Sequence, residues 1–170
     1  MLAKQANDMA SYNRLMNEKL YAACTQLSDE QRKRDCGAFF KSIHGTLNHL
    51  LLADKIWLGR FVGQPYAATR LDVELHEDFD ALRMDREVED ARILQWAGAL
   101  TNDVLVGELR YNSVVNPAPR KYEMWVAVTH FFNHQTHHRG QVTTLLSQMG
   151  VDVGVTDFLM LPDVVERNAN

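Results

Sequence analysis

Apolar residues recur along most of the chain at steps of three and four, which is the spacing of an amphipathic helix with one face toward a core. The first stripe covers about 9–27 and stops before a polar Ser-Asp-Glu triplet. A second helix is expected over about 39–61, with Phe40 as the first residue of its stripe and Gly63 after its end. The first third of the chain therefore predicts two long helices.

Two more long helices are expected in the remainder. The segment 62–78 has no clear period and is interpreted as a connector. A third helix is expected over about 79–107 and a fourth over about 123–149, where Gly150 provides a C-terminal stop. Helices of about 25 residues are about 35–40 Å long, which is the scale of a four-helix bundle.

Between the third and fourth helices the pattern changes. Short extended pieces at 109–112 and 121–122 flank the proline-rich turn 116–119, which fits a small hairpin. Beyond Gly150, apolar residues at 158–161 are expected to pack on a helix or on a second subunit. The predicted fold class is all-α: a four-helix bundle with a long connector and room for a short β-hairpin before the last helix.

Composition narrows the class of protein. The chain has 170 residues, of which 46% are hydrophobic and 24% charged, so residues 1–170 are expected to form a single globular domain. The net charge of −4 argues against nucleic acid as a partner. No apolar run is long enough to cross a bilayer, and the N-terminus lacks a secretory apolar core. A cytoplasmic location is expected, with Cys24 and Cys36 as free thiols.

Candidate chemistry lies on the fourth helix. Its core seam is apolar at both ends and polar in the middle: Met124, Ala127, Phe131, His134, His138, Gln141, Leu145. His134 and His138 are about one turn apart, so both imidazoles project the same way and can reach one ion. A buried imidazole without a partner costs about 1–3 kcal/mol, and a metal would satisfy both.

A third ligand is available on the second predicted helix. His49 shares its stripe with the small residues Thr46 and Ala53, which leave room for an ion between helices. An alternative remains open, because two histidines at this spacing also arise by chance and a carboxylate or carbonyl can satisfy a buried imidazole. We therefore expect a metal site formed by His49, His134 and His138, and weigh it against a purely structural role.

The other histidines are weaker candidates for metal ligands. His130 and His137 lie near the pair on the fourth helix and are candidates for hydrogen-bonding partners of the ligands or for boundary residues. His44 points roughly 140° away from His49 at 100° per residue, so it is a poor ligand for the same ion. His76 lies in the connector and is expected at the surface.

Two polar residues are candidates for catalysis. Asp54 falls on the apolar stripe of the second helix, where it is expected to orient a ligand imidazole, to cap a backbone group or to pair with Arg139. Gln141 lies close to the direction of His134 and is expected to hydrogen-bond a metal-bound water.

Several motifs match a known family. The first half of the chain carries the segments 11–14 (SYNR), 39–43 (FFKSI), 46–51 (TLNHLL), 53–54 (AD) and 57–58 (WL). The second half carries 130–142 (HFFNHQTHHRGQV). Together they resemble the DinB-like family of damage-inducible proteins. This resemblance implies a four-helix bundle, commonly a homodimer, and a three-histidine metal site that maps by position onto His49, His134 and His138.

The resemblance leaves the reaction open. The family includes thiol-dependent transferases and isomerases, which implies an enzyme that adds a low-molecular-weight thiol to a small electrophile. Three imidazoles leave an open coordination position, which also fits a hydrolase in which Asp54 or a nearby histidine takes a proton from water. A non-enzymatic, stress-related metal- or ligand-binding protein is the third alternative. Zinc or nickel is expected as the one divalent ion, with iron, copper or manganese as alternatives.

Overall fold

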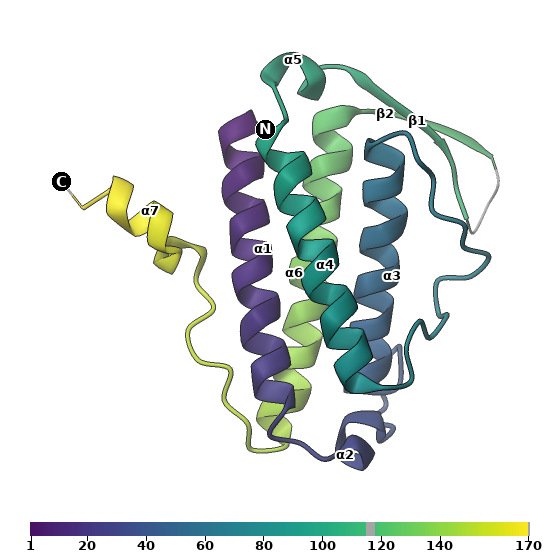
Figure 1. Cartoon of the computed structure of the whole chain (residues 1–170), viewed down its shortest axis with the longest axis vertical. Helices are drawn as coiled ribbons and strands as arrows, with labels where there is room; N and C mark the ends of the chain where they lie inside the picture. Colours follow the sequence, from purple (N-terminus) through teal and green to yellow (C-terminus); the bar gives the residue numbers. More distant parts are fainter. Residues whose placement is uncertain (115–117, 170) are drawn as a thin grey trace.

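The computed structural model describes residues 1–114 and 118–169, and its central feature is a bundle of four long helices (Figure 1). The bundle consists of α1 (Ala3–Cys24), α3 (Ile43–Phe61), α4 (Phe79–Gly98) and α6 (Met124–Gln148). The remaining elements are α2 (Asp29–Lys33), α5 (Asn102–Leu105), β1 (Glu108–Asn112), β2 (Pro119–Glu123), the 3-10 helix η1 (Phe158–Met160) and α7 (Pro162–Arg167). The predicted all-α bundle with a hairpin before the last helix is confirmed.

The arrangement of the helices explains why the chain needs a long connector between α3 and α4. Both α1 and α3 pack against α4 and α6, so α1 and α3 lie diagonally opposite each other. Helices α3 and α4 run in the same direction (Figure 1), so the chain has to return along the side of the bundle between them. Residues 62–78 make this return, and they pass beside α3.

The start of α3 differs from the sequence prediction. The helix begins at Ile43 and not near residue 39, because the Ser42 side chain caps it by accepting a hydrogen bond from the Gly45 backbone N–H at 3.0 Å. Lys41 just before has a positive φ of 66°, which interrupts helical geometry. Phe40 therefore lies in the loop before the helix, and a Cβ atom at residue 45 would lie only 2.3 Å from its carbonyl oxygen.

The third predicted helix is also shorter than expected. Helix α4 ends at Gly98 and not near residue 107, and Thr101 caps the separate helix α5 by accepting from the Val104 N–H at 3.3 Å. The hairpin pairs β1 with β2 in antiparallel register, with Leu109 opposite Tyr122. Residues 116 and 117 of the predicted turn lie outside the described residues. Gly150 adopts a φ of 78° after α6, as expected for a helix stop.

The bundle core has an apolar cluster toward each end and a polar belt in the middle. The first cluster packs around Leu47, Leu82 and Leu146, and the second around Phe131 and Ile93. The buried residues of the polar belt are Asn13, Asn17, Asp54, Arg86, Glu89, Asp90, Gln135 and Arg139. Charges this deeply buried are stable only when they are paired.

The C-terminal segment returns to α1. Phe158 packs edge-on against Tyr12 with ring centroids 5.4 Å apart, and Arg167 forms an ion pair of 2.7 Å with Asp8. Leu159 and Met160 remain exposed. Among the described residues, no helix is both long enough and apolar enough to span a bilayer.

Candidate metal centre

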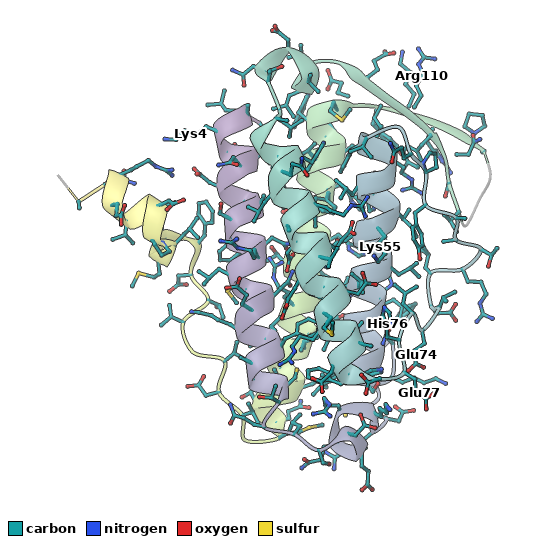
Figure 2. All side chains as sticks on the ribbon, viewed as in Figure 1. Lys4, Lys55, Glu74, His76, Glu77 and Arg110 are labelled. Atoms are coloured by element: carbon teal, nitrogen blue, oxygen red, sulfur yellow. The ribbon has the colours of Figure 1, made fainter. Side chains whose placement is uncertain are left out.

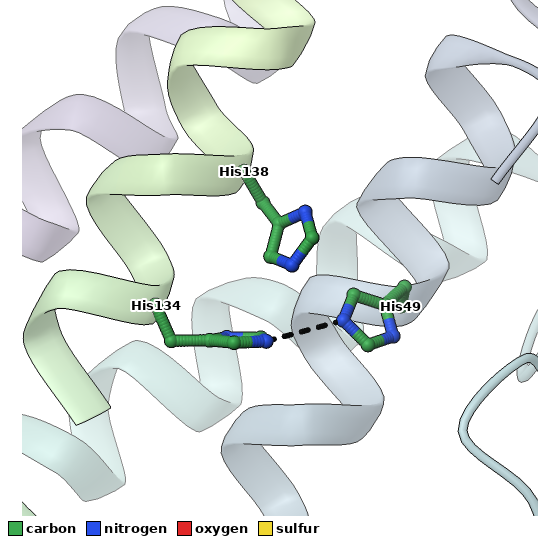
Figure 3. Close-up of side chains that lie close together, drawn as sticks. All are labelled: His49, His134 and His138. Carbon is green, nitrogen blue, oxygen red and sulfur yellow. Dashed lines mark hydrogen bonds between the residues drawn. The ribbon is translucent and has the colours of Figure 1, made fainter. Parts of the chain in front are cut away.

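The three predicted ligands meet between α3 and α6. His49 projects from α3 toward His134 and His138 on α6 (Figure 3). One ring nitrogen of each imidazole lies within 4.8 Å of those of the other two. The Nε2 atoms of His49 and His134 are 3.3 Å apart. The cluster therefore has the arrangement needed to hold a metal ion.

His49 is oriented by the connector. Its Nδ1 donates to the carbonyl oxygen of Leu71 at 2.8 Å. In the neutral imidazole this leaves the proton on Nδ1 and a lone pair on Nε2, which faces the cluster. A metal-ligating histidine commonly has such an acceptor on its other nitrogen.

The connector is itself fixed to α3 by a buried amide. Asn48 accepts hydrogen bonds from the backbone N–H groups of Leu75 at 2.8 Å and His76 at 3.0 Å. His76 lies beside the lower part of the bundle together with Glu74 (Figure 2). Asn48 and His49 are adjacent on α3. The same turn of the helix therefore anchors the connector through Asn48 and donates a hydrogen bond to the Leu71 carbonyl group through His49. The connector is therefore part of the site.

His138 is oriented from within α6. Its Nδ1 lies 2.7 Å from Oε1 of Gln141, an amide oxygen that accepts the imidazole proton. This hydrogen bond directs the lone pair of His138 Nε2 away from Gln141. Gln141 was expected to contact a metal-bound water. The structure places its amide oxygen on a candidate ligand, a contact that positions the imidazole, and the contact with a metal-bound water stays a prediction.

Phe40 covers the cluster from one side. Its ring stacks on His49 with centroids 3.8 Å apart and planes at 16°, and it meets His138 edge-on at 5.5 Å. His49 and His138 are buried, with 5% and 8% of their surfaces exposed. The aromatic ring therefore removes water from one face of the imidazoles.

Burial keeps these imidazoles neutral. It lowers the pKa of His49 to about 4, and burial together with the neighbouring imidazoles lowers the pKa of His134 to about 3. The pKa of His138 is lowered by the same cause. Imidazole binds a metal only when it is unprotonated, so at neutral pH the cluster is in the form that a metal requires.

The spacing of one pair of donors fits a tetrahedral ion. Two imidazole nitrogens that each lie about 2.0–2.1 Å from one tetrahedral zinc are about 3.3–3.4 Å apart. The observed distance between His49 Nε2 and His134 Nε2 is 3.3 Å. The donor set and this distance are thus compatible with a divalent ion, and the third donor lies within 4.8 Å of the other two.

Asp54 does not join this cluster. It is five residues from His49, which turns it roughly 140° away around α3. It is fully buried in the polar belt, where its Oδ2 lies 2.6 Å from Nη1 of Arg86. Its partner is Arg86 and not Arg139, and among the described residues no hydrogen bond joins it to an imidazole. The expectation that it orients a ligand finds no support in these contacts.

The remaining histidines lie at different distances from the cluster. His130 is exposed and close to His134, with ring centroids 6.0 Å apart, and the ring of His137 lies 4.8 Å from that of His138. His44 faces the connector, where its Nε2 lies 2.8 Å from the carbonyl oxygen of His76. Sequence reasoning had already separated His44 from the ligands by its angle around the helix.

A cavity of about 240 Å³ adjoins the cluster. His49 and His134 form one part of its lining, and Trp57, Arg60 and Tyr111 form another. The cavity therefore gives a small molecule access to the side of two candidate ligands.

The site also contains residues that sequence reasoning missed. The carbonyl group of Leu71 left no signal, because any residue type supplies one. Phe40 was assigned to a core stripe, and only the cap at Ser42 reveals that it lies before the helix. The amide of Asn48, next to a candidate ligand on an apolar helix, was the one signal that could have been used.

The fold and the site together define a class of protein: a four-helix bundle with a three-histidine cluster suited to a metal ion. The chain belongs to the DinB family, whose model matches residues 1–168. It is also similar to the protein DinB of Bacillus subtilis (strain 168), with 26% identity over 159 residues, covering 86% of this chain and 87% of that protein.

Proposed function

We propose that this chain binds one divalent metal ion through His49, His134 and His138 and uses it to transfer a low-molecular-weight thiol to a small electrophile. The observation that carries the metal proposal is the convergence of three neutral imidazoles from two helices beside a cavity. The thiol itself is supported by the family resemblance.

An enzymatic role is supported by the number of ligands. Structural zinc sites generally have four protein ligands, whereas three leave a position for water or substrate. When bound, the ion would supply a Lewis acid that lowers the pKa of a thiol or a water. The protein residues would hold the ligands through Leu71 and Gln141 and exclude water through Phe40.

The proton released from the thiol needs an acceptor. His130 lines the cavity, and although much of its surface is exposed, partial desolvation and the nearby Arg60 lower its pKa, so it is neutral at physiological pH. This makes His130 a better candidate base than Asp54, whose carboxylate is paired with Arg86. The same base would serve hydrolysis, which is the second candidate reaction.

The identity of the metal follows only from ligand type. An all-imidazole set suits zinc and nickel, and it also binds copper and iron, whereas manganese prefers oxygen ligands. Zinc or nickel is therefore proposed. The homodimer implied by the resemblance stays a prediction.

Elemental analysis of protein purified without a histidine tag tests the metal site. Wild type and the control Thr144→Ala, an exposed change further along the same helix, should retain about one ion per chain. His49→Ala and His138→Ala should lose it, because two imidazoles bind far more weakly than three. Full occupancy in either ligand variant would refute the proposed ligand set.

Cobalt-substituted protein then separates the candidate functions. A small thiol that enters the open position should produce a thiolate charge-transfer absorption. A sequestering protein with a closed coordination shell would bind the metal without this change, whereas a hydrolase would also show it and is separated by assaying thiol transfer directly. Absence of the absorption with every small thiol tested would contradict the thiol proposal while leaving the metal site intact.

A further inference from the structure

Arg60 is held in place beside the candidate metal centre by two aromatic rings. Its guanidinium carbon lies 4.6 Å from the centre of the Trp57 ring and 4.1 Å from the centre of the Tyr111 ring. Trp57 is on the adjacent turn of α3, and Tyr111 comes from β1, so the hairpin completes the clamp. Rings in this position attract a cation and limit its movement.

In the part of the chain that the structure describes, no carboxylate neutralises this cation. The chain contains 22 Asp and Glu residues, yet among the described residues none forms an ion pair with Arg60. By contrast, the buried Arg86 contacts both Asp54 and Asp90. Burial lowers the pKa of Arg60, and the neighbouring Tyr111 acts in the opposite direction, so the guanidinium group is partly desolvated.

The same side chain lines the cavity that reaches the histidines. Arg60, Trp57 and Tyr111 line it together with His49 and His134. A molecule in this cavity would therefore meet a planar cation, an indole ring and two candidate metal ligands. A guanidinium group is suited to bind a carboxylate through two parallel hydrogen bonds.

We propose that Arg60 is a specificity-determining residue that binds a carboxylate group of the substrate or co-substrate, while another part of the same molecule reaches the histidine cluster. This inference rests on the proposed function of the cluster as a metal centre open to small molecules. It identifies the ligand class as an elongated organic acid with an apolar middle that packs on Trp57.

Calorimetry on the metal-loaded protein with two matched probes tests this inference. The probes are 6-mercaptohexanoate and 6-mercaptohexan-1-ol, which share the thiol and the chain length but differ in charge. A hydrogen bond to a charged group corresponds to about 10–100-fold in affinity, so wild type should prefer the acid by about this factor. Arg60→Met should lose the preference and Arg60→Lys should keep part of it.

A charge-matched control completes the design. Arg14 is exposed on α1 and paired with Glu18, so Arg14→Met removes the same charge without altering the cavity. It should retain the wild-type preference. Equal binding of both probes to wild type would overturn the inference, and so would an unchanged preference in Arg60→Met.

Failure of the thiol chemistry can be distinguished from failure of the inference. If both probes give the cobalt–thiolate absorption but bind equally, the proposed function stands and the role of Arg60 is refuted. If neither gives that absorption, the thiol proposal fails. Hexanoate and hexan-1-ol, which lack a thiol, then test Arg60 alone: a preference for hexanoate that depends on Arg60 supports the inference, and its absence overturns it.

Discussion

Acid should destabilise the metal-free protein through the same imidazoles that form the metal site. Burial lowers the pKa of His49 to about 4 and that of His134 to about 3, whereas in the unfolded chain both take up protons near pH 6.5. Below pH 6.5 the unfolded state therefore binds more protons than the folded state. The contribution of these groups is fully present above pH 6.5 and is lost as the pH falls toward 4.

The size of the effect follows from the difference in pKa. Each pH unit between 6.5 and the folded-state pKa costs about 1.4 kcal/mol per group, so at pH 5 His49 alone removes about 2 kcal/mol. His134 is less buried and is expected to add about 1 kcal/mol after solvent screening. The combined contribution of these two imidazoles is about 3 kcal/mol, which by itself would lower the urea midpoint by about 1.5 M, given a slope of about 2 kcal/mol/M. Burial raises the pKa of Asp54 to about 7, which acts in the opposite direction, so the loss is measured as the difference between wild type and a variant that lacks His49.

Urea unfolding of chelator-treated protein at pH 7.5 and pH 5 measures this loss. His49→Gln removes one of these groups, so its stability should fall by about 2 kcal/mol less than that of wild type over the same interval. Thr144→Ala, an exposed change on α6, should behave like wild type. The reasoning would be refuted if His49→Gln lost as much stability between the two pH values as wild type does.

Two further predictions follow from the contacts of the other candidate residues. Gln141→Ala removes the acceptor that orients His138, so metal affinity measured by chelator competition should fall by about 10–100-fold. The unfolding midpoint of the metal-free protein should stay nearly unchanged, and an unaltered metal affinity would contradict the positioning role. Asp54→Ala leaves Arg86 without one of its buried partners and should destabilise the protein by about 3–5 kcal/mol in urea unfolding, whereas a stable variant with impaired metal binding would place Asp54 at the site after all.

Much of the fold could be predicted because its causes are local. The spacing of apolar residues predicted four long helices and the bundle, and the proline-flanked extended pieces predicted the hairpin. The boundaries were less accurate where a single cap or a positive φ decides them. Ser42 and Lys41 start α3 after Phe40, and a pattern based on periodicity does not detect such a change.

The candidate ligands were accessible from the sequence for the same local reason. His134 and His138 share a face because of helical geometry, and the family motifs point to His49 as their partner. The partner of Asp54 was not predicted, because membership of a broad apolar stripe does not say which neighbouring helix a side chain faces, and its catalytic role stays a prediction. That direction depends on how α3 is rotated between α4 and α6.

By itself, then, the sequence indicated the four helices and the pairing of His134 with His138, since each of these depends on residues a few positions apart on one helix, and it offered His49 as a candidate from a second helix. Only the tertiary structure decided what surrounds those imidazoles. The Leu71 carbonyl, the Phe40 ring and the clamp around Arg60 come from segments far apart in the chain. Their positions depend on the parallel course of α3 and α4, which forces the connector to return along α3, and on the hairpin that brings Tyr111 to the cavity.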